Sequence, residues 1–353
     1  MALDEAYGLS KMGHKVKILV LDSQRSIDQH TFLEIESGRI KQHEVDVEFI
    51  GDRLLKQILE LFTHKHLGND VSLFISHSLR ATVLCKLNIL KINRRKNLYS
   101  TIHQLPTLSR PIQRLKRFCY AQFTDVLFAY SYAVKQDWED RASRNFLSRA
   151  FFRKEILLNR NGIYLHRLPR RSEVINTSGN RLIFLGRNTN WKGLNTFVNL
   201  AKTKALESYD LLLIIPDFTI LDFREIAPEL SHRVQLVTSS KLEDYTPRHG
   251  DVHIYPVNYG SSAKFIESVS LNCLEMACLG VPSVVTKGGL STWQDLQEFS
   301  IFVEVDWDEL DLASNQIDYL SRSQSYFAYH ADLTSRIRIE NHLEVYAKFL
   351  SRL

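Results

Sequence analysis

The hydrophobic pattern of the chain alternates between short apolar runs and longer segments with helical spacing. Runs that predict strands lie at 15–21, 45–50, 71–76, 98–102, 125–131, 156–158, 181–185, 211–215, 234–237, 251–255, 283–286 and 301–305. Helices are predicted at 1–13, 53–64, from Leu194 onward and within 325–353, where apolar residues recur every three or four positions. Strands that alternate with helices favour parallel sheets. The chain is therefore predicted to be an α/β protein.

The most informative stretch runs from 251 to 289. Its first strand is predicted to end at Tyr255, and a loop rich in Gly, Ser and Asn follows. A short helix is then predicted from Leu271, with one apolar stripe that includes Leu274 and Cys278. Gly280 fits the left-handed residue that follows a helix end, before a last buried strand.

Two glutamates, Glu267 and Glu275, bracket the start of this helix. Backbone N–H groups at an exposed helix N-terminus attract phosphate. The N–H groups in question belong to Ser268, Val269, Ser270 and Leu271. Carboxylates beside such a site would repel phosphate, so they are expected to bind neutral hydroxyl groups of a sugar and a ribose. This arrangement favours a nucleotide sugar as ligand.

The same stretch resembles the signature of the retaining GT-B glycosyltransferases of family 4. The matching residues are Glu267, Glu275, Ala277, Gly280, Pro282, Val284, Val285, Gly288 and Gly289. Gly186-Arg187 and Lys192-Gly193-Leu194 match a second motif of the family. One departure is Ser268-Val269-Ser270, where the family often has Gly-Phe-Gly. The resemblance covers nearly the whole chain and implies two Rossmann-like, doubly wound domains that face each other across a cleft.

The resemblance also implies a role for each site residue. Glu267 would hold hydroxyls of the donor sugar, and Glu275 those of the ribose. Gly186, Arg187 and Lys192 would lie at the diphosphate, where the two cations stabilise the charge that develops as it departs. The leaving phosphate oxygen would accept the proton of the acceptor, so no protein base is required.

Two histidines follow predicted strands of the first domain. His103 comes directly after 98–102 and, by resemblance, would orient the transferred sugar; a histidine bonded to loop backbone is the alternative. His77 is a weaker candidate after 71–76, and Lys264 is a weaker candidate for phosphate binding. No metal ion or cofactor is expected, because the two cations can neutralise the diphosphate and no Asp-x-Asp pair is expected after a strand end.

The predicted elements group into two domains, residues 1–170 and 180–330, with a helix at about 338–353 that packs back on the first. The family's first strand and Gly-rich turn would precede the helix at 1–13, and they have no counterpart in this sequence. That strand is central in a doubly wound sheet, so its loss would leave two strand edges exposed. A truncated start is the expectation, and a rearranged sheet is the alternative.

Charge is distributed unevenly along the chain. Residues 1–172 contain 29 Lys and Arg against 17 Asp and Glu, whereas the remainder contains 16 against 23. Basic and apolar residues interleave at 110–123 and 141–154, which suits an anionic membrane surface as well as a solvated helix face. Nucleic acid is disfavoured, because no recognised binding motif accompanies the charge.

The compartment follows from what the sequence lacks. It has no apolar run of 18 residues, no signal peptide, and no disulfide or metal spacing among Cys85, Cys119, Cys273 and Cys278. The expectation is a cytoplasmic protein, with peripheral contact at the inner face of the plasma membrane as an option.

The expected function is transfer of a sugar from a nucleotide-sugar donor to a glycan or lipid-linked acceptor, in bacterial surface polysaccharide, lipopolysaccharide or glycolipid biosynthesis. Two alternatives stay open. A nucleotide-sugar 2-epimerase would use the same phosphate site, but it needs acid–base residues around the sugar. A non-catalytic relative would bind a nucleotide sugar or a partner subunit, and the missing strand is its best argument.

Overall fold

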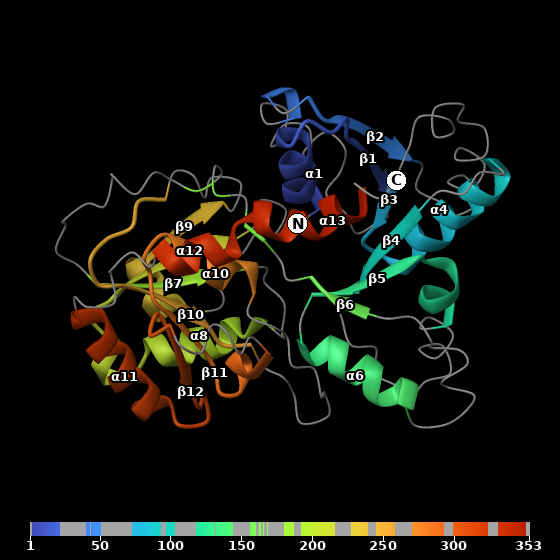
Figure 1. Cartoon of the computed structure of the whole chain (residues 1–353). Coiled ribbons are helices and arrows are strands. Elements are labelled where there is room, and N and C mark those ends of the chain that lie inside the picture. The colour runs from blue at the N-terminus through green and yellow to red at the C-terminus, as the bar shows by residue number, and fades with distance from the viewer. Residues whose placement is uncertain are drawn as a thin grey trace. The chain divides into compact units, whose positions relative to one another are not determined.

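The structure, a computed structural model, divides the chain into two compact units (Figure 1). Unit 1 is Met1–Gly162 with Ile339–Leu353, and unit 2 is Ile163–Arg338. The described residues are 2–21, 40–42, 44–50, 73–92, 97–102, 118–130, 132–143, 156–159, 162–163, 165, 168, 180–186, 192–215, 227–238, 245–257, 270–292, 299–323 and 331–350. No helix among them is long and apolar enough to cross a bilayer.

Unit 2 contains a six-stranded parallel sheet in the order β12-β11-β10-β7-β8-β9. Its strands are β7 (Arg181–Leu185), β8 (Asp210–Ile215), β9 (Val234–Thr238), β10 (Asp251–Tyr255), β11 (Ser283–Thr286) and β12 (Phe302–Val305). Its α-helices are α8 (Leu194–Ala201), α10 (Leu271–Cys278), α11 (Leu310–Arg322) and α12 (Ala331–Ile337). Short 3-10 helices are η5 (Lys204–Leu206), η6 (Pro228–Arg233) and η8 (Gly289–Thr292).

Both faces of the sheet are covered at the central strand β7, as its continuous apolar run after Arg181 predicts. Alternate residues of β7 point to opposite faces, because side chains in a strand alternate. Leu182 and Phe184 pack in the cluster that contains residues of α8 and α11. Ile183 and Leu185 pack with Met276 of α10 on the other face.

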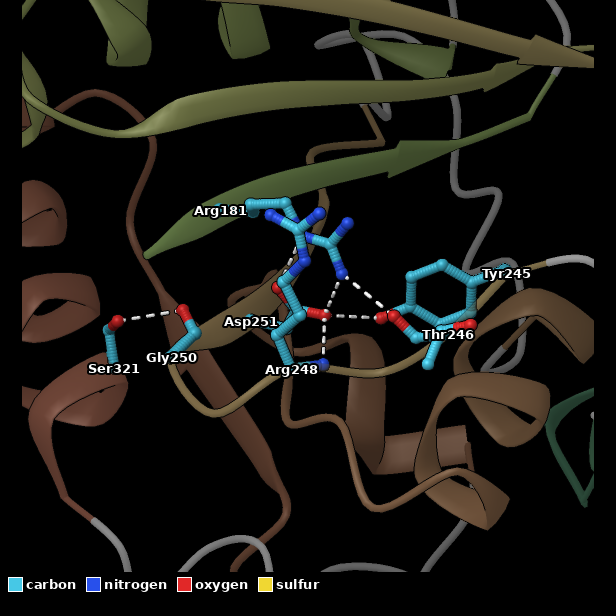
Figure 2. Close-up of polar contacts among 7 residues, drawn as sticks. All are labelled: Arg181, Tyr245, Thr246, Arg248, Gly250, Asp251 and Ser321. Carbon is cyan, nitrogen blue, oxygen red and sulfur yellow. Dashed lines mark hydrogen bonds and ion pairs between the residues drawn. The ribbon is translucent and has the colours of Figure 1, made fainter. Parts of the chain in front are cut away.

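A buried ion pair fixes the amino ends of β7 and β10 (Figure 2). Arg181 and Asp251 are the first residues of these strands and lie opposite each other in register. Arg181 donates from Nε (2.8 Å) and Nη2 (2.7 Å) to the two carboxylate oxygens of Asp251. Tyr245 Oη (2.7 Å) and the backbone N–H of Arg248 (2.8 Å) donate to the same carboxylate. Four donated hydrogen bonds thus compensate for burying this charge.

Unit 1 contains two separate parallel sheets. One pairs β1 (Lys17–Leu21) with β2 (Asp46–Ile50), and the other has the order β3-β4-β5-β6. The strands of the second sheet are β3 (Leu73–Ser76), β4 (Asn97–Ile102), β5 (Val126–Ala129) and β6 (Ile156–Leu158). The α-helices that are described over their full length in the unit are α1 (Ala2–Lys11), α4 (Leu79–Ile92), α6 (Tyr132–Ser143) and α13 (Ile339–Leu350).

The division into two sheets bears on the missing strand. Among the described residues, β1 and β3 each end a sheet, and no strand joins them. The exposure of two strand edges stays a prediction, because residues 22–39 and 51–72 lie outside the described residues. The helix predicted at 53–64 lies outside the described residues.

Helix α13 belongs to unit 1, although unit 2 precedes it in the chain (Figure 1). It packs against α1, where Gly8 lies so close to Leu343 that a Cβ at Gly8 would overlap it. The ring of Tyr346 stacks on Tyr99 of β4 (6.4 Å between centroids) and meets Phe128 of β5 edge-on (5.1 Å). Its aromatic packing makes α13 part of the core of unit 1.

The chain passes between the units at two places that contact each other. The N–H of Ile163 donates to the carbonyl of Ile337 at 2.8 Å, and Ile163 forms a parallel bridge with Arg338. Gly162 faces the backbone of Ile339, and a Cβ at Gly162 would lie 2.6 Å from the Cα of Ile339. A side chain at position 162 would therefore separate the two passages.

Candidate functional site

The strand order of unit 2 changes direction at β7. Strand β8 lies on one side of β7, and β10, which follows later in the chain, lies on the other. Open α/β sheets bind ligands beyond the carboxyl ends of their strands at such a switch point. Of the predicted site residues, Gly186, Lys192, Ser270, Leu271 and Glu275 are described, and they belong to the segments that follow β7 and β10.

Three groups converge beyond the end of β7. Gly186 follows the strand directly, and its N–H donates to the carbonyl of Ile214 at 3.1 Å. A Cβ built on Gly186 would lie 3.8 Å from Asn272 Nδ2 and 4.0 Å from Lys192 Cδ. The glycine backbone, the lysine stem and the amide of Asn272 therefore lie close together, and a Cβ at position 186 would be in ordinary van der Waals contact with the other two.

Lys192 is held by the last residue of β10. Its ammonium Nζ donates to the phenol oxygen of Tyr255 at 2.7 Å. The same nitrogen lies 4.9 Å from the centroid of the Tyr255 ring. A charged hydrogen bond thus orients one half-buried side chain.

Gly193 explains the spacing of the Lys192-Gly193-Leu194 motif. It adopts φ +75°, and a Cβ there would overlap the carbonyl oxygen of Pro256. Only glycine fits this backbone and this contact. Leu194 then begins α8 with its side chain buried, so the motif places Lys192 against the end of β10.

Helix α10 begins at Leu271, as predicted, and Ser270 is its N-cap. The Ser270 hydroxyl accepts from the N–H of Asn272 at 3.3 Å, and its carbonyl accepts from those of Cys273 (3.0 Å) and Leu274 (3.2 Å). A ligand would therefore meet the N–H groups at or before Leu271.

Asn272 was not identified from the sequence. Its Nδ2 donates to the carbonyl of Leu185 at 2.7 Å, which ties the first turn of α10 to the end of β7. This bond joins residues 87 positions apart, so no local pattern could have revealed it. Asn272 fixes the helix N-terminus relative to Gly186.

Glu275 lies in the second turn of α10 and is only 3% exposed. The predicted apolar stripe with Leu274 and Cys278 is buried, but the burial extends beyond it. Every residue from Cys273 to Cys278 is buried, because α10 packs against the sheet and also against α12. The carboxyl group of Glu275 is thus carried by an interior helix rather than by a solvated face.

Comparison with solved structures supports this architecture. HepE from Anabaena in complex with UDP-glucose superposes with a TM-score of 0.66 at 15% identity, over 96% of this chain and 100% of that one. A glycosyltransferase from Rickettsia africae gives 0.65 at 14% identity, over 99% and 93%. The apo lipopolysaccharide outer core galactosyltransferase WaaB gives 0.57 at 11% identity, over 96% and 100%.

The fold is GT-B. Both units are Rossmann-like, and the GT-B likeness extends over nearly the whole chain. The sequence matches no protein-family model, and no curated protein matches it.

One buried histidine of unit 2 was not identified from the sequence. His253 lies in β10 with no exposed surface, and its Nδ1 is 2.9 Å from Ser283 Oγ. Burial and the positive charge of Lys192 lower the pKa of His253 to about 3. Its imidazole is therefore neutral at physiological pH. Apolar neighbours on both sides in the strand gave no sign of it.

Several predicted residues cannot be placed in this GT-B framework. His103, Arg187, Glu267, Ser268, Val269 and Lys264, with most of the basic segments 110–123 and 141–154, lie outside the described residues. His77 is described and belongs to unit 1. Its Nε2 lies 3.0 Å from Oε2 of the buried Glu5, whose Oε1 lies 2.8 Å from Nε2 of His342.

The premise about Asp-x-Asp pairs is wrong. Strand β12 ends at Val305, and Asp306-Trp307-Asp308 follow it directly. Asp306 Oδ1 accepts the N–H of Asp308 at 3.1 Å, and its Oδ2 lies 3.6 Å from Lys287 Nζ. The pair follows the edge strand of the sheet, whereas Lys192 and α10 lie at β7 and β10. The expectation of a metal-free site now depends on the cations alone.

Proposed function

We propose that the protein is a glycosyltransferase that moves a sugar from a nucleotide-sugar donor to an acceptor hydroxyl. The proposal depends chiefly on one observation. Lys192, the backbone at Gly186 and the capped N-terminus of α10 converge beyond the carboxyl ends of β7 and β10. This is a small site with positive charge and oriented N–H groups, which suits a diphosphate.

The chemistry follows from where charge develops. When the glycosidic bond to the donor phosphate breaks, negative charge grows on the leaving diphosphate. The ammonium of Lys192 and the N–H groups near Leu271 are fixed before this happens, so they stabilise the charge without reorganising. Arg187 is proposed as a second cation, and Gly186 as the close backbone contact.

The remaining roles are carried over from the sequence. Glu275 is proposed to bind the ribose hydroxyls, Glu267 the hydroxyls of the donor sugar, and His103 to orient that sugar. The N–H groups of Ser268, Val269 and Ser270 are proposed to complete the phosphate site. Transfer is proposed to retain the anomeric configuration, with the leaving phosphate oxygen taking the acceptor proton and with no metal ion or cofactor.

The solved relatives narrow the expected ligands. HepE was solved with UDP-glucose, with UDP and glucose, and with UDP. We therefore propose a UDP-sugar as the first donor to test. WaaB is a lipopolysaccharide outer core galactosyltransferase, which supports a role in surface polysaccharide or glycolipid assembly. A cytoplasmic protein with peripheral membrane contact through 110–154 is proposed from its charge pattern.

Nucleotide binding tests the proposal directly. Calorimetry with UDP, GDP, ADP and inorganic pyrophosphate, all with EDTA present, should show one nucleoside diphosphate bound best. Lys192→Ala should weaken pyrophosphate and nucleotide alike, by about tenfold or more. Glu275→Gln should weaken the nucleotide and leave pyrophosphate unchanged, because pyrophosphate has no ribose.

The matched control is Lys202→Ala. This lysine lies in the same unit, and its ammonium pairs with the exposed Glu229 at 2.6 Å, so its loss should not change ligand binding. If the wild type binds no diphosphate at millimolar concentration, or if Lys202→Ala weakens binding as much as Lys192→Ala, the proposed site is wrong.

One other function is consistent with the divided sheet of unit 1. A non-catalytic relative that only binds a nucleotide sugar would have the same diphosphate site in unit 2. It predicts tight binding of the donor with no release of nucleoside diphosphate, with or without cell-extract glycolipids as acceptors. Release of UDP from UDP-glucose that depends on added acceptor would exclude it.

A further inference from the structure

We propose that Tyr255 is the positioning residue of the diphosphate site: it holds the ammonium of Lys192 beyond the ends of β7 and β10, where the diphosphate of the donor would bind. This inference rests on the proposed function. It assigns no contact between Tyr255 and the ligand. Tyr255 instead acts through Lys192, 63 positions away in the chain.

Tyr255 is rigid in a way that Lys192 by itself is not. It is the last residue of β10, is 4% exposed, and pairs in register with Val285 of β11. Its side chain packs in the same cluster as Leu274 and Ala277 of α10. One fixed side chain therefore contacts the lysine and belongs to the same packed cluster as the helix whose N-terminus would bind the diphosphate.

Lys192 and the glycine that follows it contact the end of β10 at two points. At the backbone, Gly193 lies against the carbonyl oxygen of Pro256, with no room for a Cβ. At the tip, Nζ donates to the Tyr255 phenol at 2.7 Å and lies 4.9 Å from the ring centroid. A lysine side chain in solution samples many rotamers, and this order would otherwise be imposed by the ligand. Preordering of this kind raises affinity.

The two described groups next to the Lys192 ammonium, Tyr255 and His253, are not carboxylates. The Tyr255 phenol accepts a hydrogen bond and stays neutral while it does so. His253, two residues earlier in β10, is neutral because burial and Lys192 lower its pKa to about 3. Tyr255 therefore orients the lysine without cancelling its charge, as a carboxylate partner would.

Loss of the phenol oxygen alone tests the proposal. Tyr255→Phe keeps the ring and removes the hydrogen bond, and Tyr255→Leu removes both. Calorimetry should show that Tyr255→Phe weakens inorganic pyrophosphate and UDP by about three- to tenfold, the range expected for one hydrogen bond. Tyr255→Leu should weaken them further. UMP should be affected less than UDP, because the proposed role of Tyr255 concerns the diphosphate. A merely structural role would lower both affinities equally.

Tyr209→Phe is the matched control. Tyr209 is equally buried in unit 2, and its phenol donates to Asp318 at 2.9 Å. This variant should lower stability and leave all three affinities unchanged.

The outcomes distinguish failure of the role of Tyr255 from failure of the proposed function. If Lys192→Ala loses pyrophosphate while Tyr255→Phe binds it as tightly as the wild type, or more tightly, the diphosphate site stands and the role of Tyr255 is overturned. An equal loss for UDP and UMP, or the same loss in Tyr209→Phe, also overturns it. If the wild type binds neither pyrophosphate nor UDP, the proposed function fails and the inference fails with it.

Discussion

At the scale of single residues, two glycines with similar backbones have different neighbours. Gly193 has φ +75° and abuts the Pro256 carbonyl, whereas Gly288 has φ +81° and a Cβ there would meet nothing within 4 Å. Both positions disfavour an L side chain, but only the first also excludes it by contact. The pair therefore separates backbone strain from steric overlap.

Gly193→Ala should disrupt the site as well as the fold. The new methyl group must push residues 192 and 193 away from the end of β10. We therefore expect a loss of pyrophosphate binding. We also expect the free energy of unfolding to fall by about 3 kcal/mol. Gly288→Ala should cost about 1 kcal/mol through strain alone. Urea unfolding and calorimetry on both variants check this. Equal costs for the two would contradict the steric argument.

Asp251→Asn should be among the most damaging conservative changes in unit 2. The substitution leaves the guanidinium of Arg181 buried without its counter-ion, and an amide cannot accept all four hydrogen bonds. We expect a loss of about 3–5 kcal/mol in the free energy of unfolding. Asp318→Asn is the control, because Asp318 is partly exposed and pairs with the exposed Arg322; it should cost at most about 1 kcal/mol. Urea denaturation of both variants measures the difference.

At the scale of elements, a single carboxylate joins α1, α13 and the residue after β3. Glu5 is buried, and it contacts His342 and His77. Burial alone would raise the pKa of Glu5, but the two histidines outweigh it and hold that pKa well below its ordinary value. A depressed carboxyl pKa stabilises the folded state above the unfolded-state pKa, near 4.5, and this contribution is lost as the pH falls toward the folded-state pKa.

Glu5→Gln should therefore flatten the acid side of the stability profile. The wild-type free energy of unfolding should fall steeply below about pH 4.5, by up to about 1.4 kcal/mol per pH unit from this group. The variant should lose stability at neutral pH and show a shallower acid slope. Glu139→Gln, at an exposed pair with Lys135, should leave the profile unchanged. Denaturant unfolding between pH 3 and 7 measures the free energy of unfolding of each variant. If its slope against pH were the same in Glu5→Gln as in the wild type, the argument would be contradicted.

The sequence predicted the described elements that have strong local signals. The buried parallel strand β8 is a continuous apolar run after Asp210, and Gly280, at φ +78°, ends α10 where a left-handed residue was expected. Features set by tertiary contact were missed. Tyr255 contacts Lys192, which is 63 positions away in the chain. Asn272 contacts the end of β7, which is 87 positions away. No local pattern around either residue indicates these contacts.

At the scale of the whole molecule, the two units differ in how the chain builds them. Unit 2 is one continuous segment, whereas unit 1 needs both the first part of the chain and α13. His342 and Tyr346 of α13 supply the partners of Glu5, Tyr99 and Phe128. No local pattern in residues 1–162 reveals this dependence on a helix that comes after unit 2.

This discontinuity sets an order of events during synthesis on the ribosome. Chains begin to fold as they emerge, usually from the N-terminal domain first. Here the N-terminal part emerges first but cannot close its core, because α13 is translated after all of unit 2. The later unit is thus complete first, and the earlier one waits without the core contacts of His342 and Tyr346. A nascent chain of this design depends on chaperones during that interval, so its yield in cells should respond to chaperone supply more than its equilibrium stability suggests.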